Sequence, residues 1–253
     1  MSVYAIHQED PKFIFIINYK VMYSSLYEIL PKHFPNIKFF YKKQIRNIKF
    51  QKFQKIAIVR NPYNRIVSTY YDKCQKAPEY HLNKDKSQLQ YCQHQLLNAI
   101  KKIRKENFEI AIPAKIYTLI ANPHERTLLN QNFEILKSIS FEEYVKCMDL
   151  ILNTKNVDGH FEKQYDAFNI PGQNPIYNPK KVYKSTKMIK LESIDQKWPE
   201  ICDQLGINME MRKINQTDNM RPKFNKLYSK ETKATIGRLY NIDFQKFDYS
   251  LDF

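Results

Sequence analysis

The stretch Phe13-Ile14-Phe15-Ile16-Ile17-Asn18-Tyr19-Lys20-Val21-Met22-Tyr23-Ser24-Ser25-Leu26 joins an apolar run to a polar turn and then to an amphipathic segment. An unbroken apolar run of this length predicts a strand buried on both faces, as in a parallel sheet covered by helices. Ser24 is typical of a helix N-cap, and Pro31 and Pro35 predict the end of that helix. The stretch therefore predicts a strand-to-helix corner.

A second stretch repeats this layout: Ile56-Ala57-Ile58-Val59-Arg60-Asn61-Pro62-Tyr63-Asn64-Arg65-Ile66-Val67-Ser68. Pro62 suits the first turn of a helix, because the missing amide would have no helical partner there. Two such corners predict an α/β fold with a central parallel sheet flanked by helices. Because no repeat or clear linker interrupts the chain, we expect a single domain over residues 1–253.

The first corner offers groups that bind phosphate. Backbone amides at a helix N-terminus favour an anion, and Lys20 adds a positive charge. Ser24 and Ser25 add hydroxyl donors. The chain has only four glycines, none near either corner, and Lys20 does not directly precede a serine. Both observations argue against the glycine-rich loop of kinases and NTPases.

The second corner offers a complementary set. The guanidinium of Arg60 can contact a phosphate through two N–H groups, with the Ser68 hydroxyl as a further donor. The alternative is that Lys20 faces solvent and that Arg60 and Arg65 pair with local carboxylates such as Asp72. If both corners bind phosphate, they hold the two ends of one nucleotide phosphorylated at its 5′ and 3′ positions.

Composition limits the partners without choosing among them. The formal net charge of +15 predicts attraction to an anionic cofactor, an acidic glycan or nucleic acid. With 14% aromatic residues, a non-catalytic polyanion- or nucleic-acid-binding protein is the alternative function, although no specific nucleic-acid motif is present.

The four cysteines lack zinc-ligand spacing, so we expect no metal site and a reducing compartment. The first residues do not form a signal peptide, and no apolar run approaches the ~20 residues that span a bilayer. We therefore expect a cytoplasmic protein without a membrane anchor.

Other elements follow from local patterns. A strand is expected over residues 36–40, a helix over 88–106, and a helix after the capping box Ser140-Phe141-Glu142-Glu143. Residues 154–186 are polar and predict a long loop. A third strand over 187–191, a helix from Ser193 and a last helix from Ser229 complete the prediction, with the aromatic tail packed on the domain.

Several segments in order resemble the carbohydrate sulfotransferases of the chondroitin 4-sulfotransferase type, the second sulfotransferase family. Residues 59–68 resemble the signature V-R-x-P-x-x-R-L-V-S for the 3′-phosphate, and residues 18–24 resemble the loop V-P-K-x-G-C-S for the 5′-phosphosulfate. Four more segments match shorter motifs of the family: Phe141-Glu142-Glu143-Tyr144-Val145, Asp158-Gly159-His160-Phe161, Lys190-Leu191-Glu192-Ser193 and the run from Tyr240 to Ser250.

This resemblance implies a P-loop-NTPase-like sulfotransferase fold and the donor 3′-phosphoadenosine 5′-phosphosulfate (PAPS). The sulfuryl group would pass to a hydroxyl of a carbohydrate acceptor whose identity the sequence does not name. Lys20 matches the lysine that stabilises the phosphate leaving group, and Ser24 and Ser25 match donors on the 5′ side. Arg60 and Ser68 match the ligands of the 3′-phosphate. With no anchor, we expect a bacterial or viral relative.

Transfer to a hydroxyl requires a base that removes its proton. His160 lies in the long polar loop and matches the family's histidine, so it is the candidate base. The alternative is that His160 orders the loop or contacts the acceptor. His33, Glu28 and Glu192 are rival bases, and Glu192 could instead orient a neighbour.

The chain departs from the family pattern in the first corner. Tyr19 stands where the family has proline, and Met22 stands where it has a glycine that lets the backbone approach phosphate closely. The paired cysteines that follow the family's histidine are also absent from the sequence.

Overall fold

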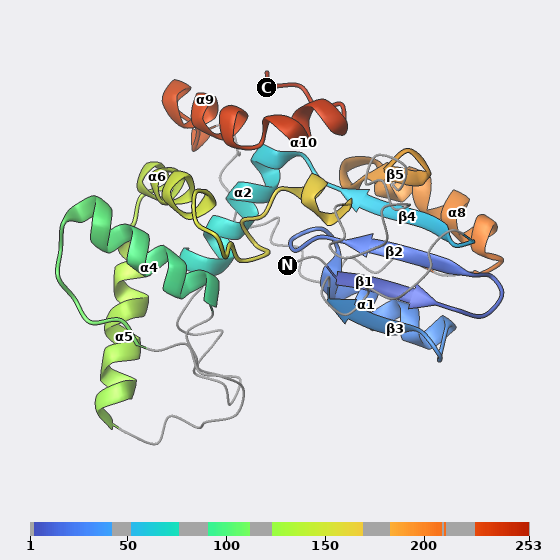
Figure 1. The fold of residues 1–253 in the computed structure, drawn as a ribbon, viewed down its shortest axis with the longest axis horizontal. Helices are drawn as coiled ribbons and strands as arrows, with labels where there is room; N and C mark the ends of the chain where they lie inside the picture. Colours follow the sequence, from blue (N-terminus) through green and yellow to red (C-terminus); the bar gives the residue numbers. More distant parts are fainter. Residues whose placement is uncertain are drawn as a thin grey trace. The chain divides into compact units, whose positions relative to one another are not determined.

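The computed structural model describes residues 3–41, 52–75, 91–111, 123–168, 183–208, 210 and 226–252. The chain falls into two compact units (Figure 1). Unit 1 comprises Met1–Pro62, Glu162–Arg221 and Tyr240–Phe253, and unit 2 comprises Tyr63–Phe161 and Pro222–Leu239. A single domain over residues 1–253 stays a prediction.

Unit 1 contains a five-stranded mixed sheet (Figure 1). Its strands are β1 (Val3–His7), β2 (Phe13–Ile17), β3 (Lys38–Tyr41), β4 (Gln54–Val59) and β5 (Thr186–Lys190), in the order β3-β1-β2-β4-β5. β2, β4 and β5 pair in parallel, whereas β1 is antiparallel to both β2 and β3. The two strands that precede the predicted corners, β2 and β4, are therefore neighbours.

The antiparallel strand β1 corrects the prediction of a parallel sheet. Only residues 8–12 lie between His7 and Phe13, and a parallel crossover needs about a dozen residues or more. The chain must therefore turn back on itself as a hairpin. The strand β1 was not predicted from the sequence. Its five residues are all buried, like those of β2, because both faces of the sheet are covered.

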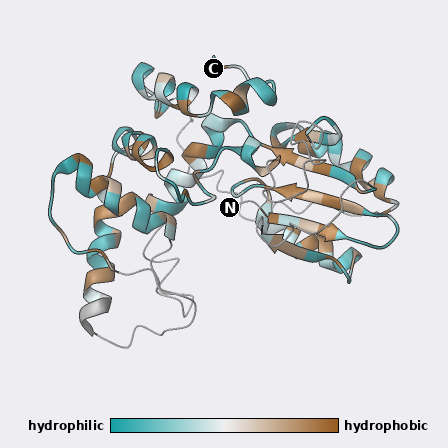
Figure 2. Ribbon diagram, viewed as in Figure 1, coloured by the Kyte–Doolittle hydropathy of each residue, from teal (hydrophilic) through white to brown (hydrophobic). Residues whose placement is uncertain are grey.

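Helices and aromatic segments cover the two faces of the sheet. One face packs against α1 (Tyr23–His33) and α8 (Ile194–Leu205), which follows the short 3-10 turn Leu191–Ser193. The other face packs against the 3-10 segment η2 (Gln164–Phe168) and Phe247, which directly follows α10 (Asn241–Lys246). Apolar residues run along the strands between these layers (Figure 2). The expected sheet flanked by helices is therefore present.

The first helix differs from its prediction at both ends. Its N-cap is Met22 rather than Ser24, and the Met22 side chain makes no capping hydrogen bond. At the other end the helix runs on to His33, with Pro31 inside its last turn. The backbone hydrogen bond from Phe34 N to Leu30 O, at 2.8 Å, spans the proline. Pro31 itself has no N–H and so removes one helical hydrogen bond.

Unit 2 is helical. It contains α2 (Pro62–Tyr70), which continues as a π-helix over Tyr71–Gln75, together with α4 (Tyr91–Arg104), α5 (Pro123–Ser138), α6 (Phe141–Leu152) and α9 (Lys230–Leu239). The start of α2 at Pro62 is confirmed, and so is the capping box. The amide of Glu143 donates to Ser140 Oγ at 3.1 Å, and the amide of Ser140 donates to Glu143 Oε2 at 2.9 Å.

Parts of two predicted segments lie outside the described residues. These are residues 88–90 of the helix expected over 88–106 and residues 169–182 of the long polar loop. The described part of that loop contains η2, a short regular element that the sequence analysis did not predict. None of the four cysteines, all of which are buried, forms a disulfide. Among the described helices, none has both the length and the apolar character needed to cross a bilayer.

Candidate functional site

The first corner follows β2 and is shaped by its own backbone. The amide of Val21 donates to Asn18 O at 3.2 Å, which closes a turn, and α1 begins with a bond from Leu26 N to Met22 O at 3.0 Å. Lys20 and Met22 have φ angles of 65° and 56°. Both lie in the left-handed region, which glycine adopts most readily. Met22 thus takes a glycine-like backbone conformation at the position where the matched loop has glycine.

The start of α1 suits an anion. Its first turn contains no acidic side chain, and its N-cap supplies no side-chain acceptor. The first amides of a helix lack acceptors within the helix and point along its positive end. Ser24 is exposed and Ser25 is buried, at 4% exposure. Of the two predicted hydroxyl donors, Ser24 is therefore the one on the surface of the corner.

The second corner follows β4 and is held by a distant glutamine. The amide of Arg60 donates to Gln164 Oε1 at 2.9 Å, and Gln164 Nε2 donates to Arg60 O at 2.7 Å. Gln164 is fully buried, and its own amide donates to Asp243 Oδ2 at 2.8 Å. Asp243 Oδ1 accepts a second bond, from Tyr165 N at 2.9 Å. The backbone of Arg60 is therefore fixed by η2, and η2 in turn by α10.

Glu192 supplies a second anchor for this corner. Its Oε1 accepts from Asn61 N at 2.9 Å, and its Oε2 accepts from the Tyr249 hydroxyl at 2.8 Å. The same hydroxyl lies 3.3 Å from Val59 O. Burial raises the pKa of Tyr249, and the charge of Glu192 raises it further. With both oxygens of Glu192 accepting hydrogen bonds, the geometry fits the predicted orienting role rather than that of a rival base.

The two corners meet at one edge of the sheet. Arg60 Nη1 donates to the backbone oxygen of Lys20 at 3.2 Å. Because β2 and β4 are parallel neighbours, Lys20 and Arg60 both lie beyond the carboxyl ends of their strands. That edge is where ligands bind in open α/β sheets. The expected closeness of Lys20 and Arg60 is present in the structure, while their binding of phosphate stays a prediction.

Ser68, the other predicted ligand of the 3′-phosphate, lies on α2 in unit 2 and is buried, at 8% exposure. Its pairing with Arg60 on one phosphate stays a prediction. Asp72, the carboxylate named in the alternative for Arg60 and Arg65, forms an ion pair with Lys73 at 2.8 Å. The alternative itself stays a prediction. Arg65, which is 1% exposed, donates through Nη2 to the backbone oxygens of Gly159 and His160, at 3.2 and 3.3 Å.

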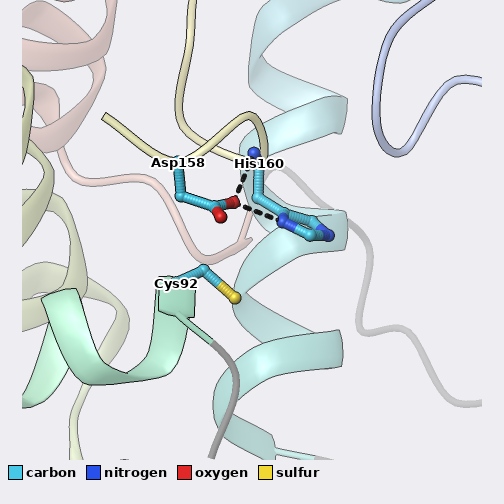
Figure 3. Close-up of side chains that lie close together, drawn as sticks. All are labelled: Cys92, Asp158 and His160. Carbon is cyan, nitrogen blue, oxygen red and sulfur yellow. Dashed lines mark hydrogen bonds and ion pairs between the residues drawn. The ribbon is translucent and has the colours of Figure 1, made fainter. Parts of the chain in front are cut away.

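The candidate base lies in a tight turn of unit 2 (Figure 3). Asp158 Oδ1 accepts from the His160 amide at 2.9 Å and lies 2.6 Å from His160 Nδ1. Phe161 N donates to Asp158 O at 2.9 Å and closes the turn. The side chain of His160 is 15% exposed. The turn therefore fixes the imidazole through its Nδ1 edge.

The charge of Asp158 defines which nitrogen of His160 is basic. Burial opposes ionisation of Asp158, but the hydrogen bond and the charge of His160 outweigh burial and lower the pKa of this carboxyl. An ionised carboxylate only accepts hydrogen bonds, so Nδ1 carries the proton and donates it to Asp158. Nε2 is then the nitrogen that can take up a proton.

Cys92 Sγ lies near this pair, and the ligand atoms of Cys92, Asp158 and His160 all fall within 4.8 Å of one another (Figure 3). Their chemistry disfavours a metal ion. Burial raises the pKa of Cys92 to about 12, so the thiol stays neutral. The buried ammonium of Lys73 interacts electrostatically with both Cys92 and Asp158, and it would repel a cation. The absence of a metal site stays a prediction.

Three of the residues that fix these groups in place, Gln164, Asp243 and Tyr249, were not predicted from the sequence, whereas an orienting role was considered for Glu192. Asp243 and Tyr249 lie within a segment that resembles a motif of the family, but that resemblance assigned them no role. Gln164 lies in no such segment. The hydrogen bond between the buried Gln164 side chain and the backbone of Arg60, 104 residues away, cannot be predicted from a local sequence pattern.

A model of the sulfotransferase family matches residues 17–250. The match includes both corners, the turn with His160 and most of the closing aromatic segment. No curated protein and no solved structure matches the chain significantly. Because the matched region covers most of the sequence, the chain belongs to the sulfotransferase family, whose members transfer a sulfuryl group from the donor PAPS.

Proposed function

We propose that this protein transfers the sulfuryl group of PAPS to a hydroxyl of a carbohydrate acceptor. The observation that supports this most directly is the bond from Arg60 Nη1 to Lys20 O. It brings two cationic corners to one edge of the sheet, as a nucleotide with phosphate at both ends requires. When bound, PAPS supplies an activated sulfuryl group whose leaving group is a phosphate.

The residues present fit such a nucleotide. The first turn of α1 has no acidic side chain that would repel a phosphate. Arginine has five N–H donors, and one of those of Arg60 donates to Lys20 O. Met22 has a left-handed backbone conformation, which is the conformation that glycine adopts most readily.

Each proposed ligand has a physical role. The ammonium of Lys20 binds the 5′ side and neutralises the negative charge that grows on the leaving phosphate. Ser24 and Ser25 add hydroxyls on that side, and the guanidinium of Arg60 with the hydroxyl of Ser68 binds the 3′-phosphate. Together these groups hold the donor in line with its acceptor, which lowers the entropic part of the barrier.

His160 is the proposed base. Its Nε2 accepts the proton of the acceptor hydroxyl, and Asp158 holds the ring and stabilises the imidazolium that forms. Arg65 keeps the turn in place through the backbone oxygens of Gly159 and His160. The alternative of a non-catalytic polyanion-binding protein has no finding in its favour. The cytoplasmic location also stays a prediction.

The test combines binding with turnover. The purified chain is mixed with 3′-phosphoadenosine 5′-phosphate, the product left after transfer, and its melting temperature is followed. It is then assayed for labelled sulfate transfer from PAPS to a panel of polysaccharides and small alcohols. We expect a clear stabilisation and transfer to at least one glycan. An unchanged melting temperature at millimolar nucleotide would contradict the proposal.

The same assay separates the candidate base from a rival. We expect His160→Ala to lower kcat by about 10² to 10⁴, the range for a lost general base, and to leave nucleotide binding unchanged. His33→Ala is the matched control, because His33 is an exposed histidine at the end of α1. Equal activity of the two variants would remove His160 from the mechanism.

A further inference from the structure

A groove of about 330 Å³ opens on unit 2, and no residue of the turn Asp158–Phe161 lines it. One wall is the exposed face of α4, and the other is the end of α6 with the residues that follow it. A volume of this size lies within the range of small-ligand sites. The polar residues that line this α4–α6 groove include Tyr91, Gln95, Asn98, Lys102, Lys155 and Asn156.

The lining has the chemistry of an acidic-sugar site. Lys102 and Lys155 supply two ammonium groups, and no described residue of the lining is acidic. Side-chain amides both donate and accept, which suits the hydroxyls of a sugar ring. Tyr91 is 47% exposed and Leu150 is 41% exposed, so an aromatic and an aliphatic surface face the ligand. An aromatic face packs well against the C–H face of a pyranose.

Hydrogen bonds join the groove to the turn that holds the proposed base. Gln95 Nε2 donates to Asn156 O at 2.5 Å, and Gln95 Oε1 accepts from Asp158 N at 3.0 Å. The Tyr91 hydroxyl lies 3.3 Å from the same Asn156 oxygen. Gln95 therefore contacts both the wall of the groove and the residue that orients His160. A ligand in the groove lies on the segment that leads into the turn.

We propose that the α4–α6 groove binds an acidic sugar unit of the acceptor, a uronate or a sulfated sugar, next to the unit that receives the new sulfuryl group. That this sugar belongs to the acceptor rests on the proposed function, but its binding in the groove requires neither bound PAPS nor sulfuryl transfer. The two lysines select the acidic group, the amides select the hydroxyls, and Tyr91 supplies the stacking surface. The groove thus gives the protein a preference for anionic over neutral glycans.

The experiment measures binding of two disaccharides by NMR titration or calorimetry. The probes are a glucuronate-containing disaccharide and lactose, which is neutral. The groove variant is Lys102→Gln with Lys155→Gln, and the control is Lys137→Gln with Lys146→Gln. The control lysines lie on α5 and α6, and they make ion pairs at the surface of unit 2. Both double variants remove the same charge, so general attraction to a cationic protein falls equally.

We expect the groove variant to bind the acidic disaccharide on the order of tenfold more weakly, as for loss of charge-assisted hydrogen bonds, and the control to bind it within twofold of the original. Tyr91→Ala should weaken both disaccharides. Equal weakening by the two double variants, equal affinity for lactose, or no measurable binding of the acidic probe would overturn the proposal. So would loss of oligonucleotide binding in the groove variant with disaccharide binding intact.

Nucleotide binding measured on the same samples separates this proposal from the general one. If the groove variant binds 3′-phosphoadenosine 5′-phosphate normally and also binds the acidic disaccharide normally, only the groove assignment fails. If the original chain binds the disaccharide through the two lysines but neither binds the nucleotide nor transfers sulfate, only the sulfotransferase mechanism fails.

Discussion

The two strand-to-helix corners of unit 1 place similar groups at one edge of the sheet but are held in different ways. The Lys20 corner is closed by a bond between Asn18 and Val21 and by residues in the left-handed region. The Arg60 corner is fixed by side chains that are 104, 131 and 190 residues away in the sequence. The first corner is therefore a local structure, and the second exists only once distant segments have assembled around it.

This difference explains which positions should be sensitive. Substitutions in the Lys20 corner should act through its charge and its backbone conformation. Substitutions that disturb the Arg60 corner should act from other segments, chiefly η2, and should appear first as lost stability.

Among substitutions at the two corners and the groups that hold them, the largest effect is expected for Lys20→Ala. Loss of a group aimed at developing charge typically lowers kcat by about 10² to 10³, and a surface lysine contributes little to the folded state. Sulfate transfer and thermal melting are measured together. Lys12→Ala is the control, because Lys12 is exposed and precedes β2 at the opposite end of the strand. Unchanged turnover in Lys20→Ala would mean that the local corner does not serve the reaction.

A smaller effect, on stability, is expected for Gln164→Ala. The substitution removes the partners of both the Arg60 amide and the Arg60 carbonyl, bonds of 2.9 and 2.7 Å. Leaving a buried polar group unsatisfied costs about 1–3 kcal/mol. Because both bonds are only partly buried, the low end of this range, about 1–1.5 kcal/mol, applies to each group, and we expect the free energy of unfolding to fall by about 2–3 kcal/mol. Urea denaturation followed by circular dichroism gives the value.

Gln204→Ala is the matched control for this measurement. Gln204 is an exposed glutamine of α8 in the same unit, and its amide lies 3.2 Å from Gln54 Oε1. An exposed substitution of this kind should change the free energy of unfolding by less than about 0.5 kcal/mol. If the two variants lose the same stability, the Arg60 corner does not depend on its distant clamp.

The same separation accounts for what could be predicted from the sequence. The apolar runs before Lys20 and Arg60 predicted where the chain leaves the sheet, because burial on both faces leaves an unbroken apolar pattern. The strand β1 was missed because its run Val3-Tyr4-Ala5-Ile6-His7 mixes aromatic, small and polar residues. Its antiparallel direction follows from the length of a hairpin rather than from the apolar pattern.

Local sequence patterns also did not identify hydrogen-bond partners that are far apart in the sequence. The turn Asp158-Gly159-His160 was found through a short motif, but the arginine that holds it, Arg65, was considered only as a partner of local carboxylates. Its partners include backbone oxygens 94 and 95 residues away. Backbone oxygens are chemically alike in every residue, so no side-chain pattern could identify them as partners.

The smallest effect is expected at Met22, where we compare the stabilities of Met22→Ala and Met22→Gly. We expect the opposite of the usual order, in which alanine is more stable than glycine. With φ at 56°, any residue that has a Cβ should be strained by about 1 kcal/mol relative to glycine. Met22→Ala and Met22→Gly lose nearly the same packing against the core under α1. The difference between their free energies of unfolding therefore measures the backbone strain alone. In an ordinary helix or strand alanine is the more stable by roughly 0.5–1 kcal/mol. Here we expect glycine to be the more stable by a similar amount in urea denaturation. An alanine variant as stable as the glycine variant would show that the Lys20 corner can relax out of its left-handed conformation, and the contrast with the clamped Arg60 corner would then lose its basis.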